Sequence, residues 1–171
     1  MIGIDIVDLS DPLFRERTNR SLDLISSEDD QFIDHPKLFW LLWSAKEAVF
    51  KTKRKITAFA PKNIPIALRK EGGKIKFESG GIEGEILVGE KSIFSIAGDN
   101  QAFDYSVVNE KSDNWSTTIR NRITSHFSEK GISATVSKSG QLPMLNDRLP
   151  ISITHHGEFA AFAYPKSILK A

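Results

Sequence analysis

The sequence predicts an α+β fold in a single domain spanning residues 1–171. Three observations predict it: an alternating segment that opens the chain, one long amphipathic helix, and a glycine-punctuated middle region typical of β-hairpins. A domain of this length can remove about 70% of its unfolded surface from water. A core is therefore available without disulfides or a structural metal.

The first element is a strand over residues 2–7. Isoleucine at positions 2, 4 and 6 alternates with Gly3, Asp5 and Val7. Because successive side chains of a strand point to opposite faces, we expect Asp5 on the face opposite the isoleucines.

Helices are predicted next from capping signals and from apolar residues that recur every three or four positions. Two short helices are expected after residues 11–12 and 27–30, a long one over residues 35–52, and another from residues 112–113 to 131. The long helix is the clearest, because its apolar stripe continues for four turns.

The remaining strands are expected over residues 74–77, 82–88, 93–97, 102–108, 132–137, 142–145, 151–155 and 159–164. The sequence shows no internal repeat and no clear linker. The predicted order is therefore one strand, three helices, a β-rich block, one helix and closing strands, which is an α+β arrangement.

Composition excludes several classes of protein. The 23 Lys and Arg residues balance 22 Asp and Glu residues, which argues against bulk binding of nucleic acid. The chain has no cysteine, which excludes disulfides, thiolate zinc sites, iron–sulfur clusters and a cysteine nucleophile. No apolar run reaches the roughly 18 residues that span a bilayer, and the N-terminus lacks a secretory signal. We therefore predict a cytoplasmic protein that neither enters a membrane nor binds nucleic acid.

Several reaction classes lack their motif. The sequence contains no Gly-x-Ser-x-Gly elbow, no phosphate-binding P-loop and no dinucleotide fingerprint. His155 and His156 are adjacent in a predicted strand and point to opposite faces, so they are poorly placed to chelate one zinc ion together.

Polar residues stand at three places where the surrounding pattern calls for apolar ones. They are Asp5, the pair Glu47 and Lys51, and His155. Each also has a simpler interpretation. Asp5 is explained as a turn acid, and Glu47 with Lys51 as a surface ion pair worth about 0.3–0.5 kcal/mol.

Two carboxylates without thiolates suit Mg²⁺, which takes one or two acids and completes its shell with water and substrate phosphate. A basic cluster after the long helix would then face the phosphates; it consists of Lys51, Lys53, Arg54 and Lys55. An equally simple alternative is a solvated helix end, where cations suit the helix dipole.

Three segments together resemble the motifs of the 4′-phosphopantetheinyl transferases: residues 3–7 (GIDIV), 43–51 (WSAKEAVFK) and 152–155 (SITH). The C-terminal place of the histidine motif resembles the holo-acyl-carrier-protein synthases, whereas the second motif, with Trp43, is nearer the surfactin type. The resemblance covers about residues 1–60 and 131–164. It implies an antiparallel sheet packed with a long helix, with a β-rich insertion at about 70–110.

The resemblance implies a magnesium-dependent enzyme of the holo-acyl-carrier-protein synthase type. Such an enzyme moves the phosphopantetheine arm of coenzyme A to a serine of an apo acyl or peptidyl carrier protein and releases adenosine 3′,5′-bisphosphate. The carrier could serve fatty acid, polyketide or peptide synthesis. A catalytically silent family member that binds coenzyme A or a carrier protein is the alternative.

Site residues follow from the same resemblance. Asp5 and Glu47 would hold Mg²⁺, and Lys51 would meet a phosphate or help to deprotonate the serine. His155 and Lys51 would bind the phosphates of coenzyme A, and Lys46 of the second motif is expected to join them. Lys53 and Arg54 depart from the family, since they replace a glycine-rich turn that often follows the helix; our hypothesis is that they contact the phosphates instead. Val7 stands where the surfactin type has a third acid, so the metal would have two carboxylates or recruit Asp8. Glu47, Lys51 and a metal-bound water are the candidates for the general base.

Partners are implied too. Carrier proteins of this superfamily are typically acidic, and Arg15, Arg17 and Arg20 are candidate docking charges. Because the sequence contains a single copy of the motifs, we expect His155 to serve the acids of a neighbouring protomer in a homo-oligomer. A trimer is the assembly that the synthases form. The inserted block could instead cover that interface and keep the protein monomeric.

Overall fold

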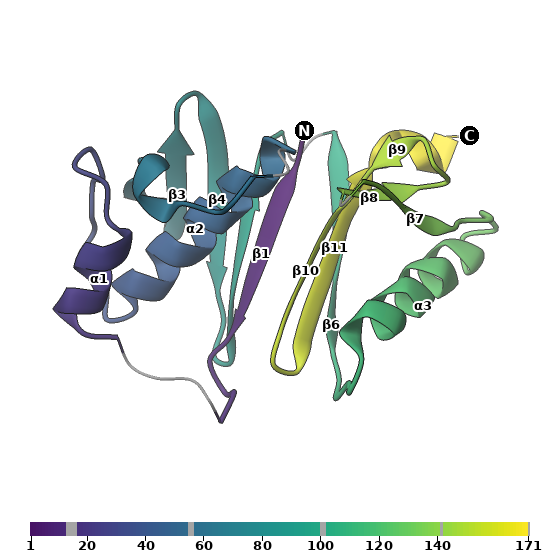
Figure 1. Cartoon of the computed structure of the whole chain (residues 1–171), viewed down its shortest axis with the longest axis horizontal. Helices are drawn as coiled ribbons and strands as arrows, with labels where there is room; N and C mark the ends of the chain where they lie inside the picture. The colour runs from purple at the N-terminus through teal and green to yellow at the C-terminus, as the bar shows by residue number, and fades with distance from the viewer. Residues whose placement is uncertain (13–16, 55–56, 100–101, 141, 171) are drawn as a thin grey trace.

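A computed structural model describes residues 1–12, 17–54, 57–99, 102–140 and 142–170 (Figure 1). The strands are β1 (Gly3–Asp8), β2 (Ala67–Glu71), β3 (Lys74–Ser79), β4 (Ile82–Val88), β5 (Ser92–Ala97), β6 (Phe103–Asn109), β7 (Val136–Ser139), β8 (Leu142–Leu145), β9 (Leu149–Pro150), β10 (Ser152–His156) and β11 (Phe159–Pro165). The helices are α1 (Asn19–Ile25), α2 (Leu38–Thr52) and α3 (Trp115–Ser128), with short 3₁₀ turns η1 (Pro61–Asn63) and η2 (Lys166–Lys170).

Two antiparallel sheets form the centre of the molecule. The first has the strand order β1-β5-β4-β3-β2, the second has the order β10-β11-β6, and a small third sheet has the order β7-β8-β9. Helix α2 covers the first sheet and α3 covers the second, with β1 and β10 side by side between them (Figure 1). The predicted α+β class is confirmed.

The alternation of β1 places its two faces in different cores. Ile4 and Ile6 pack with Phe94 and Phe159 between the two main sheets, whereas Val7 packs with the buried face of α2. Asp5 shares the α2 face with Val7, as the period of two predicts. The acid is thus carried on the side of the strand that the long helix covers.

The two halves of the chain repeat one topology, although the sequence shows no repeat. In residues 3–97 the first strand is followed by helix α2, and the closing hairpin β4–β5 pairs back with the first strand to give the order β1-β5-β4. In residues 103–165 the strand β6, the helix α3 and the hairpin β10–β11 follow in the same way and give the order β6-β11-β10. The expectation of a single copy is therefore wrong at the level of topology. The β-rich block near residues 70–110 supplies strands to both main sheets: β5 pairs with β1, and β6 pairs with β11.

Two other expectations change. Residues 27–30 form a turn in place of a second short helix, because the Asp30 side chain accepts a hydrogen bond from the Ser27 amide at 2.7 Å. The first helix begins at Asn19, with Thr18 as its N-cap. The short edge strand β2, which pairs with β3, was not predicted.

Helix α2 approaches β1 unusually closely at Gly3. A Cβ atom at this position would lie 1.9 Å from the Ala48 carbonyl oxygen and 2.8 Å from the Thr52 amide nitrogen. Only a residue without a side chain fits this crossing. The close approach brings the last turns of α2 against the strand that carries Asp5.

Candidate active site

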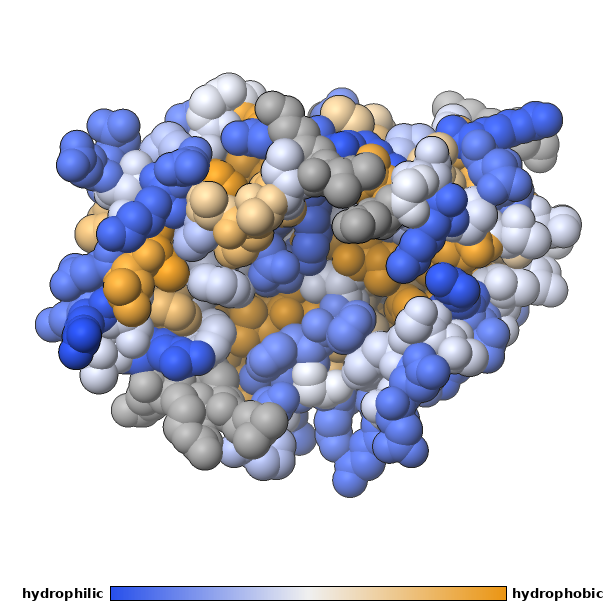
Figure 2. All heavy atoms as spheres, in the orientation of Figure 1, coloured by the Kyte–Doolittle hydropathy of each residue, from blue (hydrophilic) through white to orange (hydrophobic). Residues whose placement is uncertain are grey.

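A cavity of about 480 Å³ opens where β1, α2 and β10 meet. It is lined by four of the residues singled out in the sequence: Asp5, Glu47, Lys51 and His155. They come from three elements separated by up to 150 positions in the chain, and one protomer supplies them all. In Figure 2 hydrophobic surface lies among hydrophilic side chains near the centre of this face.

Lys51 connects α2 to the strand that carries the acid. Its Nζ atom lies 3.1 Å from Asp5 Oδ1 and donates to the Ile4 carbonyl oxygen at 3.0 Å. Asp5 is only 4% exposed, so its charge is poorly solvated and depends on these donors. These contacts hold the Lys51 ammonium group against β1 in the wall of the cavity.

Glu47 lies one helical turn before Lys51 on the same stripe of α2. Its Oε2 accepts from the Trp43 indole N–H at 3.1 Å, and its Oε1 is 3.7 Å from Lys51 Nζ. Burial raises the pKa of the Glu47 carboxyl, and the negative charge of Asp5 raises it further; Lys51 and Trp43 offset only part of this rise. The negative charge of Asp5 thus opposes ionisation of Glu47.

His155 approaches the cavity from β10 and is exposed. Its ring stacks on Trp115 of α3, with centroids 6.2 Å apart and planes 19° from parallel. Partial burial lowers the pKa of the His155 imidazole, and the positive charges of Lys51 and His156 lower it further. An imidazole of this kind gains a proton readily once a phosphate offsets those charges.

The residues present fit a magnesium ion. Asp5 and Glu47 offer hard oxygen donors to one cavity, and the repulsion that raises the pKa of Glu47 is the kind that a divalent cation relieves. In the part of the chain that the structure describes, no group of three or more His, Asp or Glu side chains could hold a metal. A site here would have two carboxylates, with further ligands from water or substrate.

Asp8 is committed elsewhere. Its Oδ1 accepts from the amide and hydroxyl of Ser10 at 2.8 and 2.7 Å, and its Oδ2 accepts from the Glu158 amide at 2.8 Å. Burial opposes its ionisation, but these hydrogen bonds together outweigh burial and lower the pKa of Asp8. Asp8 is not among the residues that line the cavity, and it ties β1 to the turn between β10 and β11.

Lys46 faces away from the cavity. Its ammonium group is completely buried, lies 2.8 Å from Asp30 Oδ2 and donates to the carbonyl oxygens of Pro61 and Ile64 at 3.1 and 2.7 Å. Consecutive helical residues point about 100° apart, so Lys46 and Glu47 serve different faces of α2. This placement contradicts the prediction that Lys46 binds coenzyme A.

Lys53 and Arg54 of the basic cluster are not among the residues that line the cavity, whereas Lys51 is. The guanidinium of Arg54 donates to the carbonyl oxygens of Ile151 and Pro143, both at 3.1 Å, and so joins the end of α2 to the second half of the chain. Lys53 is exposed and lines a different, open depression. The predicted roles of Lys53 and Arg54 in binding coenzyme A are not supported, and Lys55 lies outside the described residues.

Sequence reasoning missed part of the cavity wall. Phe39, Trp40 and Trp43 of α2 form an aromatic side, and the Arg17 guanidinium lies 5.5 and 5.2 Å from the ring centroids of Phe39 and Trp40. The sequence predicts a docking role for Arg17, and the structure places it in the cavity wall; Arg15 lies outside the described residues. The aromatic spacing along α2 was the available signal, but it also fits an ordinary core.

Comparison with protein families matches residues 1–108 to the 4′-phosphopantetheinyl transferase superfamily (ACPS). The chain belongs to this superfamily. No curated protein and no solved structure gives a match. Membership supports transfer of a phosphopantetheine group as the general activity, with coenzyme A and Mg²⁺ as the usual requirements of the family.

The superfamily match ends before β10, so it does not include His155. The place of His155 in the site rests on the structure, in which it lines the cavity together with the two acids. Because the histidine and the acids of this transferase line one cavity within one protomer, sharing between protomers is not required. The reason for expecting a homo-oligomer is thereby removed, and the oligomeric state itself stays a prediction. None of the described helices is long and apolar enough to cross a membrane.

Proposed function

We propose that this protein transfers the 4′-phosphopantetheine arm of coenzyme A to a serine of an acidic apo carrier protein. The holo-acyl-carrier-protein synthase reaction is the specific form of this activity. The supporting observation is that Asp5, Glu47, Lys51 and His155 line one cavity in a chain of this superfamily. The proposal includes one domain over residues 1–171, in which the β-rich block at about 70–110 contributes strands to both main sheets, and a cytoplasmic location.

Charge accounts for the binding roles. The pyrophosphate of coenzyme A carries negative charge that must be neutralised before another oxygen can approach its phosphorus. Asp5 and Glu47 are the residues that would hold Mg²⁺, which supplies charge neutralisation when bound. Lys51 adds a fixed cation from α2, and His155 adds a second contact to phosphate from β10.

The reaction replaces one phosphoester oxygen by another. The serine Oγ bonds to the phosphorus that carries the pantetheine arm, and the bond from this phosphorus to the bridging oxygen breaks. Adenosine 3′,5′-bisphosphate leaves with that oxygen. The serine proton passes to Glu47, whose carboxylate lines the same cavity. Lys51 is already a donor to Asp5 and to the Ile4 carbonyl, which favours Glu47 as the proton acceptor.

The test is the intact mass of an apo acyl carrier protein after incubation with this protein, coenzyme A and Mg²⁺. A gain of one phosphopantetheine that disappears with Asp5→Ala supports the proposal. Lys53→Ala is the matched control and should leave the gain unchanged, because Lys53 lies outside the cavity. Coenzyme A binding without any mass gain on several acidic carriers would instead identify a silent member of the superfamily.

A further inference from the structure

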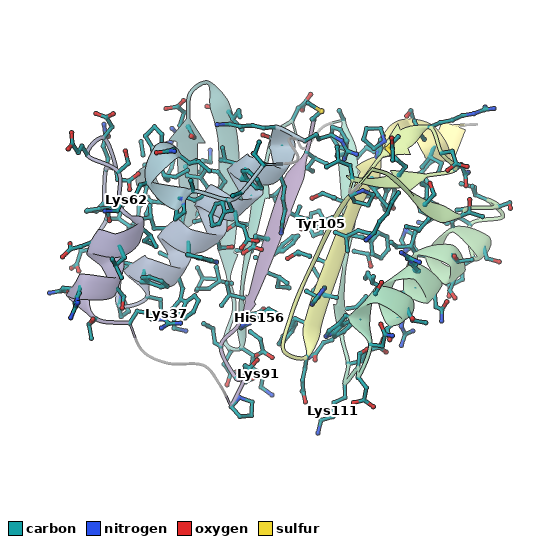
Figure 3. All side chains as sticks on the ribbon, in the orientation of Figure 1. Lys37, Lys62, Lys91, Tyr105, Lys111 and His156 are labelled. Carbon is teal, nitrogen blue, oxygen red and sulfur yellow. The ribbon has the colours of Figure 1, made fainter. Side chains whose placement is uncertain are left out.

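The two halves of the molecule meet through side chains of β10. Strands β1 and β10 run in the same direction without pairing as strands of one sheet. The side chains of Ser152, Thr154 and His156 instead accept hydrogen bonds from the β1 amides of Ile4, Ile6 and Asp8, at 3.1, 3.3 and 2.8 Å. Figure 3 labels His156 near the end of β1, where this row of contacts ends.

Thr154 differs from the other two residues of this row. Its Oγ1 atom accepts from the Ile6 amide and also donates to Asp5 Oδ1 at 3.1 Å. Because the incoming amide occupies the acceptor side, the hydroxyl proton is directed to the carboxylate. Both side chains are buried, with residue exposures of 5% for Thr154 and 4% for Asp5, so water competes little for this bond.

The bond fixes the rotation of the Asp5 carboxylate. Oδ1 receives both the Thr154 hydroxyl and the Lys51 ammonium, each at 3.1 Å. Among the described residues no hydrogen bond reaches Oδ2, which leaves that oxygen for a cation in the cavity. A carboxylate held by two donors on one oxygen is preorganised, and such partners commonly change metal affinity by 10- to 100-fold when removed.

We propose that Thr154 is a positioning residue that orients Asp5 for a divalent cation and so couples the second half of the chain to the metal site of the first. This inference rests on the proposed function. Thr154 is not itself a ligand in this proposal; it acts only through Asp5. Within residues 152–155 the resemblance implies a role for His155 and none for Thr154.

Ser152 provides a matched control. It lies on the same strand, is equally buried at 5% exposure, and accepts a β1 amide at nearly the same distance. It is not among the residues lining the cavity, and Asp5 is not among its hydrogen-bond partners in the described chain. Ser152→Ala therefore removes one contact between the halves and leaves the orientation of Asp5 intact.

The experiment measures binding of Mn²⁺ alone by electron paramagnetic resonance of the free ion. Thr154→Val keeps the shape and removes the hydroxyl, and we expect it to raise the Mn²⁺ dissociation constant about tenfold. Thr154→Ser restores the hydroxyl and should return the constant to within about twofold of wild type. Ser152→Ala should leave it unchanged.

Two results would overturn the inference while leaving the proposed function intact. One is an unchanged Mn²⁺ constant in Thr154→Val, and the other is an equal rise in Ser152→Ala, which would assign the effect to the contact between halves in general. Circular dichroism verifies that each variant is folded. A wild-type protein that neither binds Mn²⁺ nor modifies a carrier would overturn the proposed function as well.

Discussion

The ammonium group of Lys51 lies 3.1 Å from the carboxylate of Asp5, across the contact between the long helix and the opening strand. The same nitrogen is 3.7 Å from Glu47, so one cation stands between two acids. This explains how a chain can keep two carboxylates in a largely apolar contact region before any metal binds. It also makes Lys51 part of the stability of the site.

Removing the Lys51 charge should destabilise the protein. Lys51→Met leaves the buried Asp5 without its cation, and we expect a loss of about 2 kcal/mol in the free energy of unfolding at pH 7. This is below the 3–5 kcal/mol typical of a buried pair, because the Lys51 side chain is 24% exposed. Chemical denaturation in the absence of divalent cations measures the loss.

A double-mutant cycle tests the cause. Asp5→Asn in the Lys51→Met background should recover at least half of the loss, since no unpaired charge then remains buried. Lys53 is exposed at the C-terminal end of α2, so Lys53→Met should change stability by less than about 0.5 kcal/mol. Additive effects of Asp5→Asn and Lys51→Met would contradict the pairing.

The Gly3 crossing makes a second prediction. Gly3→Ala should cost at least about 1–3 kcal/mol of stability, because the new methyl group meets backbone atoms of α2 that cannot move independently. Carrier modification should fall too, since Glu47 and Lys51 belong to the helix that the new methyl group would displace. Thermal unfolding and the intact-mass assay measure the two effects. Gly89→Ala is the control, because a Cβ atom at Gly89 would make only ordinary contacts at 3.4 Å or more. A normal melting temperature for Gly3→Ala would refute the steric argument.

Lys46 is expected to be a structural residue. Lys46→Met leaves Asp30 buried and unpaired, and should reduce stability by about 3–5 kcal/mol. The KM for coenzyme A of the folded variant, measured at a temperature where it remains native, should stay within about twofold of wild type. Lys62→Met, exposed on η1, controls for loss of a nearby positive charge. A tenfold rise in KM would return Lys46 to the binding role that the sequence suggested.

Local patterns predicted much of this molecule because their periods are fixed by backbone geometry. Alternation at residues 2–7 determined the face that carries Asp5, and the apolar stripe of the long helix determined that Glu47 and Lys51 share one side. The glycine-bounded strands were found for the same reason. These predictions needed only neighbours in the sequence.

Other features depend on distant segments. The sequence alone does not say which loop covers the Lys46 side of the helix, so the buried contact with Asp30 could not be foreseen. The repeated topology leaves no sequence repeat, because each half packs its own set of side chains in the same order of elements. A small hydroxyl such as that of Thr154 gives no distinctive pattern in a strand.

The cavity within one chain predicts that mutants will not rescue each other. Asp5→Ala and His155→Ala proteins are each expected to be deficient in carrier modification. They should remain deficient after they are mixed and refolded together, because every chain still lacks one part of its own site. The intact-mass assay measures activity, and light scattering measures the oligomeric state. Recovery of about a quarter or more of wild-type activity would show instead that the site is shared between protomers.

His155 should take up a proton when coenzyme A binds. Burial and the charges of Lys51 and His156 hold the pKa of His155 below its ordinary value of 6.5, so the free imidazole is mostly neutral at pH 7. A bound phosphate favours the imidazolium and raises that pKa, so affinity should increase as the pH falls from 8 toward 6.5. Calorimetry in two buffers of different ionisation enthalpy measures the proton uptake directly. His155→Gln is the control, because it removes the imidazole while the phosphates of coenzyme A still titrate. The wild type should therefore take up more protons than the variant. Equal proton uptake by both proteins would exclude His155 from phosphate binding.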